Sequence, residues 1–223
     1  MMPNENPFQQ SLRENIGEVL DMGTMVEKAL ASSVEALKKR DLNLAHQTMA
    51  DDRKIDEKRF AIEKRSIELI STYRPAIVDL NTIAAILNII TELERIGDYA
   101  AGIAKIVIMI GDEPPLKPLI DIPRMSEITI EMIHNSLNSF KDNDSKAATY
   151  VADMDDVVDS LYDQIFRELL TFMMTDPKTI NRATRLIWVA HNIERAADRA
   201  TNISERVIYM LTGKIEDSGS AKY

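Results

Sequence analysis

The nine residues ERIGDYAAG at positions 94–102 return as ERAADRATN at positions 194–202, which is 100 residues later. Both copies begin with a glutamate and carry an aspartate four residues on. A second acidic spacing, D-x-x-x-D, precedes each copy at residues 52–56 and 155–159. The offset between matching residues of the two halves changes little along the chain. These motifs therefore indicate duplication of a unit of roughly 100 residues with small changes in its loops.

Helical periodicity surrounds both copies of the motif. Apolar residues recur at steps of three and four, so we expect helices over residues 7–39, 42–72, 78–110, 124–140, 145–174 and 178–212. Residues 111–123 hold Pro114, Pro115, Pro118 and Pro123, which predicts a linker between the halves. The sequence therefore predicts an all-α fold of two tandem three-helix bundles related by internal duplication. The expected boundaries are 1–111 for the first repeat, 112–123 for the linker, 124–213 for the second repeat and 214–223 for a polar tail.

The repeated acids fall where the expected helices would otherwise be apolar. The predicted inward seam of 78–110 runs through Ile83 and Ile90 and then meets Glu94 and Asp98. Residues four apart share one helix face, so each half can bring two acidic pairs together. Four carboxylates in a partly desolvated place raise one another's pKa values unless a cation compensates them. The candidate metal ligands are Asp52, Asp56, Glu94 and Asp98 in the first half, and Asp155, Asp159, Glu194 and Asp198 in the second.

The alternative for any single pair is a surface acid pair matched by Arg or Lys, and Arg95 and Arg195 directly follow the two glutamates. Four duplicated pairs favour a metal site instead. Oxygen donors suit Mg, Mn, Ca or Fe better than structural zinc. His191, close before Glu194, is an additional candidate ligand, with simple packing at a helix interface as the alternative. A ferritin-type oxidase site needs Glu-x-x-His on two helices, and the chain has this spacing once, at Glu131–His134 and apart from the acidic pairs, which disfavours such a site.

Composition excludes several classes of function. The chain has 7 glycines in 223 residues and no Gly-rich phosphate loop, and its lack of cysteine excludes thiolate metal sites and cysteine nucleophiles. A net charge of −9 makes nucleic acid a poor partner. No catalytic constellation is present, so we expect no enzyme. Without a signal-peptide pattern or an apolar stretch of about 20 residues, we expect a cytoplasmic protein.

The paired motifs, each with its upstream D-x-x-x-D, resemble the signature of the PhoU family, and the resemblance covers nearly the whole chain. It implies a cytoplasmic regulator of phosphate uptake that represses phosphate-starvation signalling. The implied partners are the phosphate transporter ATPase and a sensor histidine kinase, with attachment to the inner face of the membrane only through partners. The resemblance also implies a homodimer.

The same resemblance implies a multinuclear metal cluster of iron or zinc, or bound Mg or Mn, on the eight carboxylates named above. Asn202 closes the second motif and is a further candidate at the site, whereas the first motif ends in Gly102. If that side chain helps to hold metal, the two sites differ in occupancy.

Two other functions stay open at this point. One is a metal-dependent phosphohydrolase, against which the lack of a nucleophile or general base speaks. The other is a PhoU-domain protein that serves another transporter or stores metal.

Three further features have structural interpretations. The basic and acidic run at 53–65 is expected to be a solvated face with helical ion pairs, with a docking patch as the alternative. Trp188 is expected in the core, as are Met22, Met25, Met125, Met132, Met173 and Met174.

Overall fold

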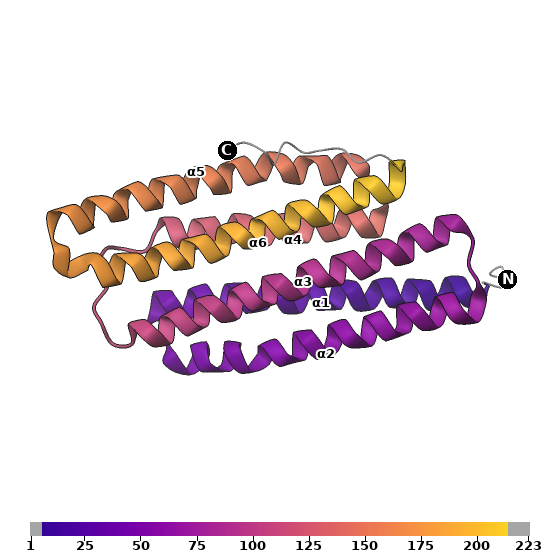
Figure 1. Cartoon of the computed structure of the whole chain (residues 1–223), viewed down its shortest axis with the longest axis horizontal. Coiled ribbons are helices and arrows are strands. Elements are labelled where there is room, and N and C mark those ends of the chain that lie inside the picture. Colours follow the sequence, from indigo (N-terminus) through magenta and orange to yellow (C-terminus); the bar gives the residue numbers. More distant parts are fainter. Residues whose placement is uncertain (1–5, 214–223) are drawn as a thin grey trace.

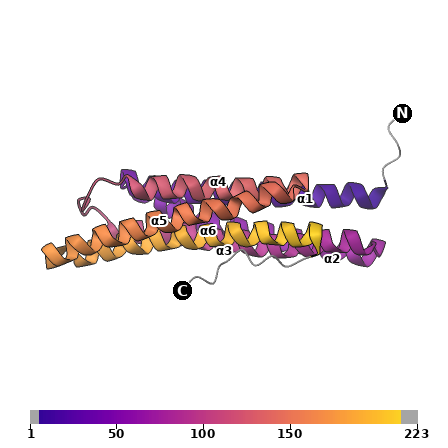
Figure 2. The same ribbon diagram turned by 90° about the horizontal axis from the view of Figure 1, so that it is seen from above.

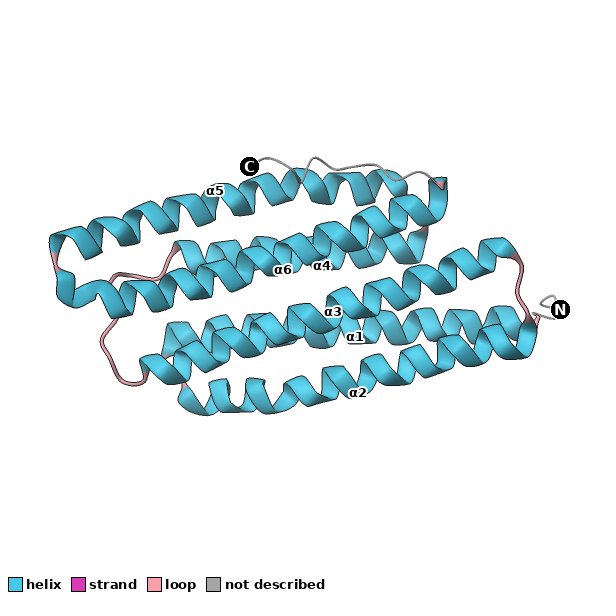
Figure 3. Cartoon of the chain, viewed as in Figure 1, coloured by secondary structure: helices cyan, strands magenta, loops and turns pink. Residues whose placement is uncertain are grey.

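The chain folds into long helices that run side by side, as the computed structural model of residues 6–213 shows (Figure 1 and Figure 3). The helices are α1 (Pro7–Lys39), α2 (Leu42–Tyr73), α3 (Ile77–Ile110), α4 (Asp121–Asp142), α5 (Ser145–Thr175) and α6 (Ile180–Thr212), with a 3-10 turn, η1 (Pro177–Thr179), before α6. No strand occurs within residues 6–213. The predicted all-α class is confirmed, and the predicted tail 214–223 lies outside the described residues.

The helix ends follow from local chemistry. Asn6 and Asp41 cap α1 and α2, since their side chains accept hydrogen bonds from the backbone N–H groups of Phe8 (3.1 Å) and Leu44 (3.0 Å). Gly111 (φ +60°) and Gly213 (φ +68°) end α3 and α6 in the positive-φ region that glycine adopts at little cost.

The two halves lie side by side around a shared interface. Helix α3 packs against α6, and α1 packs against α4, whereas α2 and α5 lie at opposite edges of the molecule. Figure 2 shows α1 and α4 together in one layer, above the layer that contains α3 and α6 in that view. Buried side chains of both halves form one hydrophobic cluster. The helices of each three-helix unit also pack on one another, so the cores of the two units are continuous across the α3–α6 and α1–α4 contacts.

Three expectations about position were wrong. Helix α4 begins at Asp121, inside the predicted linker, because Pro123 falls in its first turn, where a missing N–H costs nothing. Trp188 is 47% exposed and Met174 is 84% exposed, so neither lies in the core. Trp188 follows an apolar stretch of α6, but its position on the helix turns it outward.

The basic and acidic run on α2 is a solvated face, as expected. Arg53, Arg59 and Lys64 each lie near the glutamate four residues later. Lys58 and Arg65 bridge instead to Glu18 and Glu14 on α1. These ion pairs satisfy the cations of the run within the protein itself. No helix in the described part of the chain is long and apolar enough to cross a membrane.

Candidate metal centre

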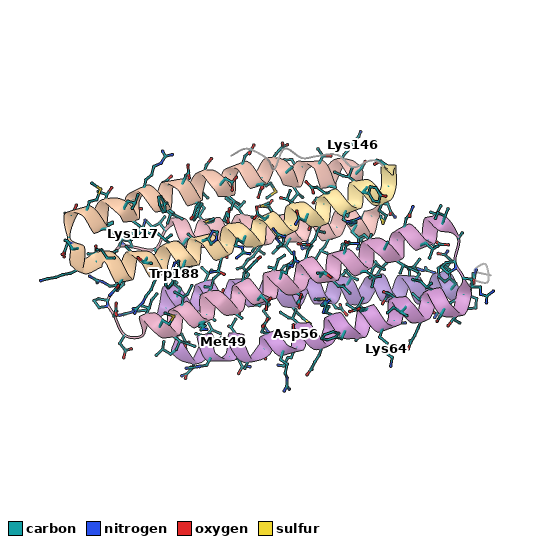
Figure 4. All side chains as sticks on the ribbon, viewed as in Figure 1. Met49, Asp56, Lys64, Lys117, Lys146 and Trp188 are labelled. Carbon is teal, nitrogen blue, oxygen red and sulfur yellow. The ribbon has the colours of Figure 1, made fainter. Side chains whose placement is uncertain are left out.

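The eight predicted ligands form two groups at equivalent places in the two halves. The first carboxylate cluster contains Asp52 and Asp56 of α2 with Glu94 and Asp98 of α3. The second carboxylate cluster contains Asp155 and Asp159 of α5 with Glu194 and Asp198 of α6. Each cluster lies where an edge helix packs on a central helix; Figure 4 marks Asp56 on α2.

The acids flank the buried stripe of each helix and do not interrupt it, which corrects the predicted seam. On α3 the residues that are buried next to Glu94 are Leu93, Ile96 and Gly97, whereas Glu94 is half-buried and Asp98 is exposed. Full burial of an uncompensated carboxylate would cost several kcal/mol. The helix is therefore turned so that its acids lie at the margin of the core, within reach of solvent.

In the first carboxylate cluster, α2 and α3 approach closely at Gly97. A Cβ atom at this position would lie 3.1 Å from Oδ1 of Asp52 and 3.1 Å from Cδ1 of Ile55. Glycine therefore lets a carboxylate of α2 lie directly against the backbone of α3. Burial, followed by the negative charges of the other three acids of the cluster, raises the pKa of Asp52 to about 6. Partial desolvation beside α2, followed by the charge of Asp56, also raises the pKa of Asp98.

The pKa values are raised further in the second carboxylate cluster than in the first. Burial is the largest cause that raises the pKa of Asp155 to about 7 and that of Glu194 to about 7, and the neighbouring carboxylates add to it. Burial likewise raises the pKa values of Asp159 and Asp198. Asp155 Oδ1 and Glu194 Oε2 are buried without a hydrogen-bond partner. Two buried acceptors without a hydrogen-bond partner, on carboxylates whose pKa values are raised, fit the chemistry of a cation site.

Asp156 and Glu205, which the sequence analysis did not identify, also lie near the second carboxylate cluster. The charges of Asp156 and Glu205 add to the raised pKa of Asp155. Glu205 lies seven residues after Asp198, two turns along the same side of α6, and this spacing could have identified it. The first half carries Lys105 at the corresponding position. The second carboxylate cluster is therefore surrounded by more negative charge than the first.

His191 lies at the second carboxylate cluster, where Nδ1 is 3.3 Å from Oε2 of Glu194 without the alignment of a hydrogen bond. Its ring centroid lies 6.0 Å from that of Tyr162 on α5. The corresponding residue of the first half, Thr91, bonds to the carbonyl of Leu87 in its own helix. A nitrogen donor is thus placed beside one cluster and not beside the other.

Asn202 lies at the α3–α6 interface, where its Nδ2 donates to Oε2 of Glu92 at 3.3 Å. The two arginines next to the acidic motifs also turn to this interface. Arg195 lies over the ring of Tyr99, 4.8 Å from its centroid, and Arg95 lies 3.7 Å from Glu92. Neither arginine forms an ion pair within 4 Å with an acid of the clusters.

The two clusters match a hard cation in charge and donor chemistry. Both consist of carboxylate oxygens, which suit Mg, Mn, Ca or Fe. In residues 6–213, however, no group of three or more His, Asp or Glu side chains is arranged to hold a metal ion as it stands. Carboxylates repel one another, and in this part of the chain the one ion pair that Lys or Arg forms with the clusters joins Arg199 to Asp198 at 3.8 Å, so the side chains of each cluster would have to draw together around a metal.

Comparison with known proteins identifies the family that shares this architecture. The family model of the PhoU domain matches residues 19–107 and again residues 122–207. A phosphate-specific transport system accessory protein PhoU homolog from Aquifex aeolicus is 41% identical over 206 residues, which is 92% of this chain and 93% of the relative. A homolog of the same description from Clostridium acetobutylicum is 37% identical over 211 residues, 94% of this chain and 96% of the relative.

Solved structures agree with the sequence comparison. The crystal structure of PhoU from Pseudomonas aeruginosa superposes with a TM-score of 0.88 at 33% identity, covering 93% of this chain and all of that one. The phosphate transport system regulatory protein PhoU from Streptococcus pneumoniae superposes with a TM-score of 0.87 at 27% identity, covering 94% of this chain and 99% of that one. The two domain matches coincide with the two three-helix units, and the duplicated acidic motifs lie at equivalent places in them. The chain belongs to the PhoU family.

Proposed function

We propose that this protein is a metal-binding cytoplasmic regulator of phosphate uptake. In this role it is an adaptor between the ATPase of the phosphate transporter and a sensor histidine kinase, and it represses phosphate-starvation signalling when phosphate is plentiful. The observation that carries the metal part is the pair of carboxylate clusters with raised pKa values. The names of its relatives, accessory proteins of the phosphate-specific transport system, support the transporter part.

Each cluster would hold its metal through the four acids that define it, with His191 beside the second one. A multinuclear iron or zinc cluster, or Mg or Mn, would supply positive charge that balances the carboxylates. Its expected effect is structural, because each cluster joins an edge helix to a central helix. Loading would therefore fix α2 on α3 and α5 on α6.

The proposed adaptor acts without catalysis, and its relatives are named accessory or regulatory proteins rather than enzymes. It would work as a homodimer in the cytoplasm and reach the inner face of the membrane only through its partners. Direct binding of phosphate to bare carboxylates is unfavourable because both are anions, so any anionic partner group would need the metal as a bridge.

Metal analysis of protein purified without chelator tests the first part. We expect Glu94→Ala/Asp98→Ala and Glu194→Ala/Asp198→Ala each to lose the metal of one cluster. The control is Glu127→Ala/Glu131→Ala, which removes an exposed acid pair of the same spacing from α4. Wild-type metal content in both cluster variants would show that the assignment of the sites is wrong.

Co-purification with the transporter ATPase and with the sensor kinase tests the second part. We expect both partners to be retained by the wild-type protein, and retention to fall in the cluster variants. Metal binding with no retention of either partner would leave the centre intact and overturn the adaptor role. It would then point to metal storage or to another transporter.

A further inference from the structure

A pocket opens where the linker joins the two halves, remote from the turn between α2 and α3. Its lining comes from the C-terminal ends of α1 and α3, from the linker and from the start of α6, which meet at one end of the molecule (Figure 1). The lining is mostly apolar, with Leu37, Ile110, Leu116, Leu119 and Leu186 beside two prolines. The pocket encloses about 50 Å³ and is partly open to solvent.

The linker that forms one wall is held in place on both sides. Lys117, marked in Figure 4, is buried, hydrogen-bonds to Glu168 of α5 and lies 3.5 Å from Asp121 of α4. Arg182 Nη1 of α6 donates to the carbonyl of Pro114 at 3.3 Å. With the wall fixed by these contacts, the pocket exists before any ligand arrives, which lowers the ordering cost of binding.

The rim of this pocket is positive although the chain carries a net charge of −9. Lys38, Arg40 and Arg182 line it, and within residues 6–213 none of them has a carboxylate oxygen within 4 Å. Glu113, the acid in the lining, is already bound by Arg185 at 3.0 Å. The rim therefore presents cations whose charge the protein does not balance at close range.

Helix electrostatics explain only part of this arrangement. Lys38 lies in the last turn of α1, where a cation is favourable beside the exposed carbonyl groups. Arg182 lies in the first turn of α6, where the helix dipole disfavours a cation. One of its nitrogens binds the linker carbonyl, and the residue lines the same pocket as Lys38.

We propose that this pocket binds a small amphipathic anion, a molecule with a short apolar body and one carboxylate or phosphate group. The apolar body would displace water from the leucine side chains, while the charged group would lie at the rim between Lys38, Arg40 and Arg182. Such a ligand would contact α1, α3, the linker and α6 together. It would thus join the two halves at the end where the chain passes from one to the other.

Calorimetric titration of the full chain with four probes tests the chemistry. We expect butyrate and butyl phosphate to bind saturably with one site per chain, and the tighter of the two identifies the preferred head group. Acetate, which lacks the apolar body, and butanol, which lacks the charge, should bind at least tenfold more weakly. Shortening butyrate should weaken binding by up to about fourfold per methylene group.

Variants locate the site. Lys38→Gln/Arg182→Gln should weaken butyrate binding at least tenfold, and Leu119→Ser should weaken it without removing a charge. Lys146→Gln removes an exposed cation at the far end of α5 (Figure 4) and should leave the affinity unchanged. Circular dichroism confirms that each variant is folded. Equal binding of butanol and butyrate, wild-type affinity in the double variant, or no saturable binding of any probe would each overturn the proposal.

Discussion

Asn202 of α6 donates a hydrogen bond to Glu92 of α3, and the internal repeat places a second pair in the same relation. Glu92 corresponds to Asn192, and Asn202 corresponds to Gly102, at the offset of 100. In the second pair, a Cβ on Gly102 would lie 3.1 Å from Oδ1 of Asn192. The two halves therefore meet through equivalent positions of α3 and α6, occupied by a hydrogen bond on one side and by a close backbone approach on the other. The difference between Gly102 and Asn202 is explained by this interface.

Glu92→Gln should lower the free energy of unfolding by about 1–3 kcal/mol. Glu92 is mostly buried and lies 3.3 Å from Arg199 and 3.7 Å from Arg95. The amide would remove the carboxylate that faces Arg95 and would leave Arg199 with Asp198 alone, at 3.8 Å. Urea denaturation measures the change. Glu131→Gln, an exposed position on α4, is the control and should change stability by no more than about 0.5 kcal/mol. Equal effects of the two substitutions would show that the interface does not depend on this charge.

Gly97→Ala should destabilise the first half, because the new Cβ would lie 3.1 Å from both Asp52 and Ile55. We expect a loss of about 1–3 kcal/mol and weaker metal binding at the first carboxylate cluster. Gly17→Ala in α1 is the matched control, since nothing lies within 4 Å of its added Cβ. This control should stabilise the protein by up to about 1 kcal/mol through helix propensity. Thermal and urea denaturation of both variants, together with metal analysis, separate the effect of the close contact from the effect of helix propensity.

Lys117→Met should loosen the linker. The substitution removes the positive charge that joins Glu168 of α5 and Asp121 of α4. Asp121, whose side chain is only 20% exposed, would then lack its ion-pair partner. We expect a loss of about 1–3 kcal/mol in unfolding free energy and faster proteolysis within residues 111–120. Limited proteolysis followed by mass spectrometry locates the cleavage. Lys146→Met, an exposed position, should leave the cleavage pattern unchanged.

The helices and the acid pairs could be predicted from the sequence because both depend on local spacing. Asp41 and Gly111 mark helix ends by capping chemistry, and residues four apart share a face in any α-helix. Rotation of a helix about its axis depends on its neighbours instead. The apolar run before Glu94 fits a seam that includes Glu94 and equally well one that passes through Leu93 and Gly97. The structure selects the second, because it places the carboxylates at the margin of the core.

The exposed Trp188 and the shared core could not be predicted for a related reason. The apolar residues around Trp188 are consistent with burial, but which of them face inward depends on α5 and on the other half of the molecule. Packing of α3 on α6 relies on pairs such as Glu92 and Asn202, whose contact spans 110 residues. A pattern within one repeat carries no information about such a contact.

The metal-free protein should lose stability as the pH rises. In an unfolded chain, Asp and Glu titrate near pH 4, whereas in the folded protein the pKa of Asp52 is about 6 and those of Asp155 and Glu194 are about 7. A group whose pKa is raised by folding holds its proton more tightly in the folded state. Its contribution to stability is fully present below about pH 4 and is lost as the pH rises through 6 and 7. Urea denaturation in EDTA should therefore give a smaller unfolding free energy at pH 8 than at pH 5.

Two further measurements assign this loss to the carboxylate clusters. Asp155→Asn/Glu194→Gln removes the two acids with the highest pKa values, so the metal-free variant should be more stable than the wild-type protein at pH 8 and depend less on pH. Saturating Mn²⁺ at pH 8 should restore the stability of the wild-type protein, because a bound cation replaces the protons, and should help the variant much less. If the wild-type protein and the variant lose the same stability between pH 5 and pH 8, the dependence comes from groups elsewhere, and the second carboxylate cluster is not the place where charge accumulates.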